Sequence, residues 1–213
     1  LATSVSKQER RKIKKLYNTN TVLYPNSVTI DTKIRKKFIN YDYIYYSGSY
    51  LYKPNKYAID YLNQKIMPIV FKEFPKLKLV ITGGGFNLNY PWLINRDIVS
   101  KENLYNIIYH SLCLCVPLKF GSGTRIKIIE ALCLGTPVVS TYKGIEGIAI
   151  KEKNPPFIFD KDKEIIKSIK FIIKNKRKIK IKSLSQKKYY LNEFSMKNAT
   201  ERFLKKNLNY FFY

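Results

Sequence analysis

The chain is poor in the residues that build metal and redox sites. Its 213 residues include one histidine and three cysteines. Cys113, Cys115 and Cys133 all lie inside apolar segments, without the spacing of metal ligands. Such an odd set predicts reduced, packed thiols, as in a cytoplasmic protein. We therefore expect no metal site, and we expect His110 to be a surface or edge residue rather than a catalytic one.

Long apolar runs are also absent. No run approaches the roughly 20 apolar residues of a membrane-spanning helix, and no signal peptide is visible. The chain opens at Leu1 rather than Met, so we expect sequence to precede it. Its apolar fraction of 45% predicts a folded globular protein, long enough for one large or two small domains.

Acidic residues are scarce, with 15 against 40 Lys and Arg, for a net charge of +25. The excess is concentrated at the two ends: 10 to 2 in residues 1–40, 14 to 8 in 41–159 and 16 to 5 in 160–213. One interpretation is attraction to an anionic membrane surface, and another is nucleic acid. A third is compositional drift, since 33 of the 40 are Lys. We favour compositional drift over attraction to a membrane surface. We expect no nucleic-acid binding, because no recognised binding module appears.

What the chain does have is an alternation of apolar strands with helices. The predicted strands are 21–24, 41–47, 77–82, 98–100, 112–116, 138–140 and 157–159. The predicted helices are 4–17, 55–71, 102–110, 126–134, 165–174 and 187–206, with Ser6 and Glu9 as a capping box and Pro68 as a kink or end. The lysine run at 174–182 is expected to be a solvated loop or helix face. Continuous apolar strands between helices predict an α/β fold with a doubly wound parallel sheet.

Glycines follow three of the predicted strands, at Gly48, at 83–85 and at 121–123. Each one singly is explained by a tight turn. Together they would line the carboxyl edge of the sheet, where open α/β folds bind ligands. This convergence predicts a nucleotide site.

The most informative stretch is 117–141, PLKFGSGTRIKIIEALCLGTPVVST. Its glycine-bracketed loop can direct backbone N–H groups at an anion, because a helix N-terminus carries free donors and partial positive charge. Arg125 and Lys127 add two cations there. The alternative is that both are ordinary solvated residues, although cations are unfavourable at a helix start without an anion nearby.

One carboxylate, Glu130, stands inside the apolar helix 126–134. A buried charge is costly without a partner, so we expect Glu130 to have a specific hydrogen-bond donor. The alternative to a functional role is a structural contact with backbone amides or with Lys127, one turn away. Gly135 and Pro137 are expected to end the helix.

Residues 117–147 resemble the nucleotide-sugar-binding signature of family 4 glycosyltransferases, which have the GT-B fold. Shorter stretches resemble the family in the same order, and together the resemblance spans roughly residues 4–205. These stretches are YPNSV at 24–28, YSGS at 46–49, KPN at 53–55, the strand and loop at 79–85, and NEFS at 192–195, with Met196 in place of the usual Trp.

The resemblance implies a Rossmann-like donor-binding domain, the C-terminal half of a GT-B fold, with the N-terminal acceptor domain largely absent. Residues 1–30 would be the tail of that domain and a linker, 31–190 the donor-binding domain, and 191–213 the C-terminal helix. The implied activity is metal-independent, retaining transfer of a hexosyl group from a nucleoside diphosphate-sugar to a saccharide or lipid-linked acceptor, in surface polysaccharide or glycolipid synthesis. The implied location is the cytoplasm, with peripheral docking at the inner face of the membrane.

By resemblance, Glu130 holds the ribose hydroxyls of the donor, whereas Ser122 stands where the family has a first Glu. Ser49 and Asn55 stand where many members carry an Arg and a Lys on the diphosphate. We expect Arg125 and Lys127 to supply that charge from the other loop. The expected catalytic residues are Arg125, Lys127 and Glu130, and the expected donor-binding residues are Gly48, Ser49, Gly84, Gly121, Ser122, Gly123, Thr124 and Glu146.

Two alternatives stay open. A sugar-nucleotide epimerase shares the fold, but the segment GSGTRIKIIEA suits the transferase branch better. A catalytically incomplete remnant that binds a nucleotide-sugar without transferring it is the other, and the missing acceptor half favours it.

Overall fold

A six-stranded sheet forms the centre of the computed structural model, which describes residues 2–30, 40–148, 150 and 156–207. Its strands are β3 (Tyr43–Ser47), β4 (Lys78–Thr82), β5 (Leu93–Asn95), β6 (Cys113–Val116), β7 (Val138–Ser140) and β8 (Phe157–Ile158). They lie in the order β5-β4-β3-β6-β7-β8, and every pair is parallel. This is the order of a Rossmann sheet, with its switch point between β3 and β6. The predicted doubly wound fold is confirmed.

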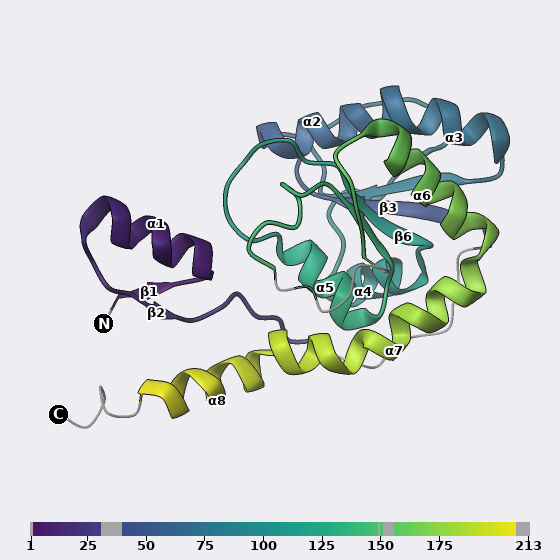
Figure 1. Cartoon of the computed structure of the whole chain (residues 1–213). Coiled ribbons are helices and arrows are strands. Elements are labelled where there is room, and N and C mark those ends of the chain that lie inside the picture. Colours follow the sequence, from purple (N-terminus) through teal and green to yellow (C-terminus); the bar gives the residue numbers. More distant parts are fainter. Residues whose placement is uncertain (1, 31–39, 149, 151–155, 208–213) are drawn as a thin grey trace.

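Helices cover both faces of the sheet (Figure 1). They are α2 (Lys53–Tyr61), a π-helical turn at Leu62–Ile66, α3 (Met67–Glu73), α4 (Lys101–His110), α5 (Ile126–Leu134), α6 (Asp162–Lys174) and α7 (Lys176–Phe194). The helices α2, α3 and α6 lie on one face, and α4, α5 and α7 lie on the other. This double cover explains why β6 is apolar and buried along its whole length.

The central strand β3 is unusual in burying three tyrosines, Tyr43, Tyr45 and Tyr46. A buried phenol needs a hydrogen-bond partner, and each of these finds one. Tyr43 donates to Ile107 O at 2.8 Å, Tyr45 Oη lies 2.5 Å from Thr82 Oγ1, and Tyr46 donates to Asn55 Oδ1 at 2.8 Å. The last of these bonds fixes Asn55 beside the end of β3.

Three predictions about elements need correction. The strand expected at 98–100 is absent: β5 lies at Leu93–Asn95, and Ile98 is 87% exposed on the loop that follows. The helix expected at 55–71 is interrupted by the π-helical turn, and Pro68 stands in the first turn of α3, where its missing N–H costs nothing. The helix expected at 187–206 is two helices, α7 and α8 (Met196–Asn207), that meet at Ser195.

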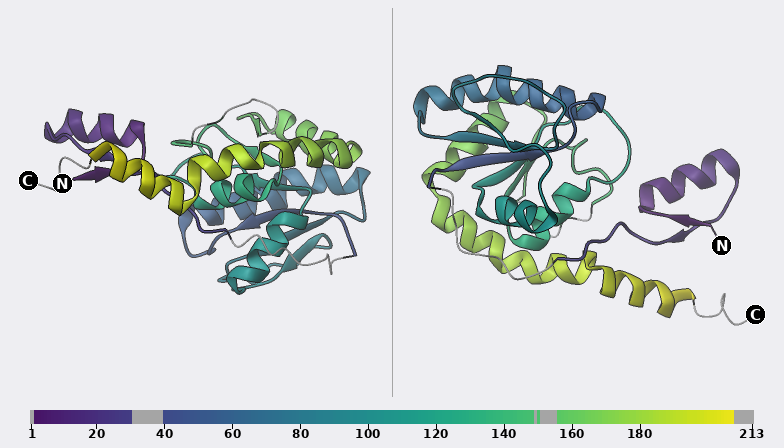
Figure 2. Two further views of the ribbon diagram at one scale, coloured as in Figure 1. Left: turned by 90° about the horizontal axis from the view of Figure 1, so that it is seen from below. Right: turned by 180° about the vertical axis from the view of Figure 1, so that it is seen from behind.

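The N-terminal segment stands apart from the sheet (Figures 1 and 2). It consists of β1 (Thr3–Ser4), α1 (Lys7–Tyr17) and β2 (Val22–Leu23), and the two strands pair in parallel. The predicted cap is confirmed, because Ser6 Oγ accepts from Glu9 N at 3.1 Å. Glu9 in turn accepts from Val5 N at 2.6 Å, one residue before the position that a capping box would use.

The residues that follow this segment contact the C-terminal helices. Val28 forms a bridge with Ser195, and Val28 N donates to Phe194 O at 2.8 Å. Tyr24 packs edge-on against Phe203 of α8. The domain limits expected at 30/31 and 190/191 stay predictions; residues 31–39 and 208–213 lie outside the described residues. Within the described part of the chain, no helix has the length and apolar character needed to cross a membrane.

Candidate functional site

The glycine loops after β3, β4 and β6 meet at the carboxyl edge of the sheet. Gly48 N donates to Thr82 O at 2.8 Å, and a Cβ built on Gly83 would lie 2.5 Å from the carbonyl carbon of Gly48. Gly121 approaches α2, since its Cβ would lie 3.0 Å from Pro54 Cγ. The close approach at Gly83 and its φ of +126° exclude a larger residue there. The convergence predicted for the three loops is therefore present.

Lys127 crosses the switch point from α5 to the end of β3. Its Nζ donates to Ser47 O and, at 3.0 Å, to Asn55 Oδ1, and it lies 4.2 Å from the ring centroid of Tyr46. Burial, with a smaller contribution from Arg125, lowers the pKa of Lys127 to about 7, against an opposing effect of Glu130. The structure thus places the Lys127 amino group, on a half-buried side chain, between the two loops.

Arg125 lies at the N-terminus of α5, on the last turn of the glycine loop. Its Nη1 donates to Ser122 O at 2.5 Å and to Gly123 O. Its Nε and Nη2 atoms are buried and have no hydrogen-bond partner within the described residues. Two guanidinium donors without acceptors are costly in the free protein, and an anion at this place would satisfy them.

Glu130 lies one turn after Lys127 on α5 and is half-buried. Its expected donor is not found, since no hydrogen bond or ion pair joins this carboxylate to another of the residues described, and Lys127 points to Ser47 and Asn55 instead. Burial raises the pKa of Glu130, while Lys101 and Lys127 oppose that rise. The structural contact considered as the alternative for Glu130 is thus not made with Lys127.

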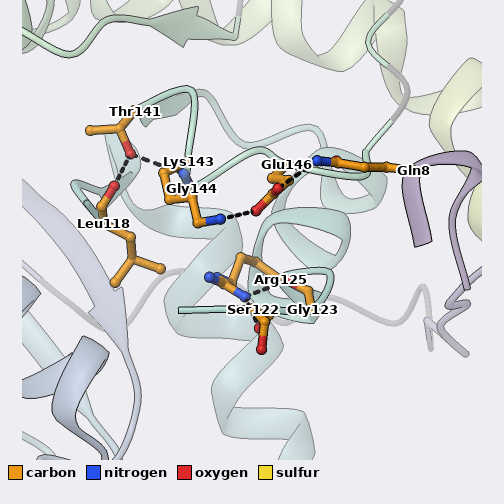
Figure 3. Close-up of polar contacts among 9 residues, drawn as sticks. All are labelled: Gln8, Leu118, Ser122, Gly123, Arg125, Thr141, Lys143, Gly144 and Glu146. Carbon is orange, nitrogen blue, oxygen red and sulfur yellow. Dashed lines mark hydrogen bonds and ion pairs between the residues drawn. The ribbon is translucent and has the colours of Figure 1, made fainter. Parts of the chain in front are cut away.

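The loop 141–147, YKGIEG after Thr141, lies next to the glycine loop (Figure 3). Thr141 Oγ1 donates to Leu118 O and accepts from Gly144 N at 3.0 Å. Glu146 binds Lys143 at 2.5 Å and accepts from Gln8 of α1 at 2.8 Å. The Glu146 carboxylate is therefore already bound by Lys143 and Gln8.

The remaining predicted residues lie at the same edge with lesser contacts. Ser49 Oγ accepts from Leu51 N at 3.3 Å, and Gly84 O accepts from Tyr50 N at 3.1 Å. Thr124 Oγ1 would lie 3.2 Å from a Cβ on Gly147. Ser122 and Gly123 contribute the carbonyl groups that bind Arg125.

Sequence reasoning missed two contacts. Asn55 was recognised as a departure from the family, but its position as the acceptor of Lys127 follows only from the fold. Gln8 gave no signal at all, because nothing local marks a residue 138 positions from its partner. Within the described ranges, no three His, Cys, Asp or Glu side chains cluster as a metal site.

Comparison with known proteins identifies relatives of this domain. Residues 41–175 match the family model described as Glycosyl transferases group 1. No curated protein sequence matches the chain.

Solved structures share the fold at low identity. S. aureus TarM has a TM-score of 0.76 at 17% identity, over 98% of this chain and 43% of TarM. Anabaena HepE, in complex with UDP-glucose, has a TM-score of 0.72 at 12% identity, over 98% of this chain and 64% of HepE. The C-terminal domain of a Francisella tularensis group 1 family protein, LpcC, has a TM-score of 0.56 at 10% identity, over 72% of this chain and 85% of that domain.

The chain thus spans less than two thirds of the length of TarM and of HepE. Its fold is the half of a GT-B enzyme that the LpcC domain represents. The family match covers well over half of the residues, and it includes the glycine loops, Arg125, Lys127 and Glu130. The chain belongs to the group 1 glycosyltransferases, family 4, as its resemblance predicted.

Proposed function

We propose that this chain is the donor-binding domain of a glycosyltransferase and that it binds a UDP-sugar. The observation that carries the proposal is Arg125, whose Nε and Nη2 are buried at the glycine loop and have no partner in the described part of the chain. Lys127 supports it, because a buried ammonium at the switch point is costly unless an anion comes near. UDP is the nucleotide named with both TarM and HepE, which supports the choice of base.

In the proposed reaction, Arg125 and Lys127 stabilise the charge that develops on the diphosphate as the glycosyl group leaves. Backbone N–H groups of the glycine loops and the start of α5 complete this anion site. Glu130 accepts hydrogen bonds from the ribose hydroxyls. These groups provide the electrostatic stabilisation without a metal, and the transfer retains the configuration at the anomeric carbon, as the resemblance implies.

The proposed acceptor is a saccharide or a lipid-linked saccharide, for surface polysaccharide or glycolipid synthesis in the cytoplasm. Docking at an anionic membrane is supported by α7, where residues 176–192 hold seven cations and no acid. Sedimentation with phosphatidylglycerol-containing vesicles, but not with phosphatidylcholine vesicles, would support this docking; no binding to either would refute it.

The first test is thermal unfolding of the chain with UDP, GDP, ADP, dTDP or CMP, with and without Mg²⁺. A ligand at about 100 times its Kd adds roughly 2.7 kcal/mol to the free energy of unfolding. We expect a metal-independent shift with UDP that is lost in Arg125→Ala and in Glu130→Ala. Arg177→Ala, on the exposed start of α7, is the matched control and keeps the shift.

No shift with any nucleotide would overturn the proposal. If Arg125→Ala and Glu130→Ala bound UDP as tightly as the parent chain, the assigned site would be wrong even though a nucleotide binds. The second candidate, a remnant that binds but does not transfer, is supported by Ser122, Ser49 and Asn55, where charges of the family are missing. UDP binding by a full-length protein that neither hydrolyses nor transfers any UDP-sugar would favour it.

A further inference from the structure

Glu146 and Arg125 lie within electrostatic reach of each other but do not form an ion pair. The pKa of Glu146 is lowered mainly by its bond with Lys143, then by Gln8, and Arg125 adds a further effect. A carboxylate beside a guanidinium with two free donors ordinarily forms a bidentate pair. Here Nε and Nη2 of Arg125 have no hydrogen-bond partner among the residues that the structure describes. Both oxygens of the Glu146 carboxylate are instead bound by other side chains.

Two side chains hold it, and they come from distant parts of the chain (Figure 3). Lys143 Nζ binds Glu146 Oε2 at 2.5 Å, within the same loop. Gln8 Nε2 of α1 donates to Glu146 Oε1 at 2.8 Å, across 138 positions of sequence. Both carboxylate oxygens are thus engaged, Oε2 by Lys143 and Oε1 by Gln8.

The backbone on both sides of this contact is closely fitted. A Cβ built on Gly147 would lie 3.4 Å from Ser6 Cβ at the start of α1, and 3.2 Å from Thr124 Oγ1 of the glycine loop. Gly144 is fixed more tightly, since its Cβ would lie 2.2 Å from Ser140 Oγ. The loop 141–147 therefore touches α1 on one side and the glycine loop on the other.

We propose that Gln8 is a positioning residue for the donor: by binding Glu146 it keeps the Arg125 guanidinium free for the donor diphosphate. The inference rests on the proposed function. It makes the N-terminal segment part of the donor site, although α1 buries no residue of its own. When the contact with α1 is lost, Glu146 turns toward Arg125 and competes with the diphosphate for the same nitrogen atoms.

The expected coupling is modest. The bond between Gln8 and Glu146 is exposed to solvent, and Lys143 still binds the carboxylate when Gln8 is removed. Exposed charge-assisted contacts are worth little individually, so loss of Gln8 is expected to weaken UDP binding by about fivefold. Raising the salt concentration should reduce that factor, because the competing Arg125–Glu146 pair would be screened.

The experiment is a double-mutant cycle on UDP affinity, measured by calorimetry for the parent chain, Gln8→Ala, Glu146→Gln and Gln8→Ala/Glu146→Gln. We expect Gln8→Ala to lose about fivefold relative to the parent chain, and the affinity of Glu146→Gln serves as the reference for the second half of the cycle. In the Glu146→Gln background, Gln8→Ala should lose nothing, because the competing carboxylate is gone. Lys12→Ala, on the exposed surface of the same helix, is the matched control and keeps the parent affinity.

Each outcome is decisive. Unchanged affinity in Gln8→Ala overturns the inference and leaves the proposed function intact. An equal loss with and without the Glu146→Gln change also overturns it, since Gln8 would then act through general structure. Failure of the parent chain to bind UDP overturns the proposed function, and the role of Gln8 with it. Melting temperatures of all variants, expected to match the parent, separate these results from misfolding.

Discussion

The two loops on either side of the switch point differ in charge. The β3–α2 loop contributes Gly48 and Ser49, and the first turn of α2 contributes Asn55, all uncharged, whereas the β6–α5 segment contributes Arg125 and Lys127. Yet the ammonium group of Lys127 lies 3.0 Å from Asn55 Oδ1, at the β3 side of the crevice. Lys127 therefore belongs to the β6–α5 segment in sequence, but its charge lies on the β3 side of the crevice. A long side chain from α5 can provide charge to a loop that has none.

The largest effect on UDP affinity is expected from removing the charge of Lys127. Lys127→Met keeps most of the side-chain volume but deletes the charge, so UDP affinity should fall by about 10- to 100-fold. At pH 6 the free energy of unfolding should rise, because a lone buried cation destabilises the fold. Calorimetry measures the UDP affinity, and urea unfolding measures the free energy of unfolding. Equal UDP affinity together with lower stability would make Lys127 a purely structural residue.

A second variant moves the charge instead of deleting it. Asn55→Lys in the Lys127→Met background puts an ammonium on the β3 side directly, where Lys127 Nζ now lies. We expect it to recover about tenfold of the lost UDP affinity, because a charge-assisted contact is worth about 1.5–3 kcal/mol. Asn55→Gln in the same background is the neutral control. If the lysine variant recovers no more than the glutamine variant, the location of the charge on α5 is essential.

The pH dependence of UDP binding also tests the role of the Lys127 charge. Burial lowers the pKa of Lys127 to about 7, so the free site loses its proton as the pH rises through neutrality. A bound diphosphate favours the protonated form, and affinity should therefore fall by about tenfold from pH 7 to pH 9. The folded-state pKa is below the unfolded value of about 10.4, so the penalty on stability is full below pH 7 and disappears toward pH 10. Lys127→Met should flatten both profiles.

The sequence predicted the fold well because its signals are local. The helix 126–134 and the strand 138–140 were predicted to the residue, since Gly135 at φ +71° and Pro137 mark the boundary physically. The strand predicted at 98–100 is wrong because the apolar Ile98 is exposed on a loop, while the true edge strand, Leu93–Asn95, is only partly buried and has no clear pattern.

The site was predictable only in part, for the same reason. Glycines at strand ends converge in any parallel sheet, so the site's location followed from topology. The partner of Lys127 did not, because on a helix Glu130 lies at the favoured spacing from Lys127, and only the closed fold brings Ser47 and Asn55 closer. Gln8 depends on a contact between segments, which no pattern along the chain encodes.

The smallest effect is expected on the uncharged side of the crevice. Ser49→Ala removes a hydroxyl that accepts from Leu51 N at 3.3 Å and that can donate to a phosphate oxygen. A neutral hydrogen bond contributes about 0.5–1.5 kcal/mol, so UDP affinity should fall by about threefold at most. Ser122→Ala, on the charged side, is the comparison, because Arg125 binds the backbone carbonyl of Ser122, which the substitution keeps. A loss at Ser49 as large as that at Lys127 would mean that the uncharged loop determines donor binding, and the contrast between the two loops would be reversed.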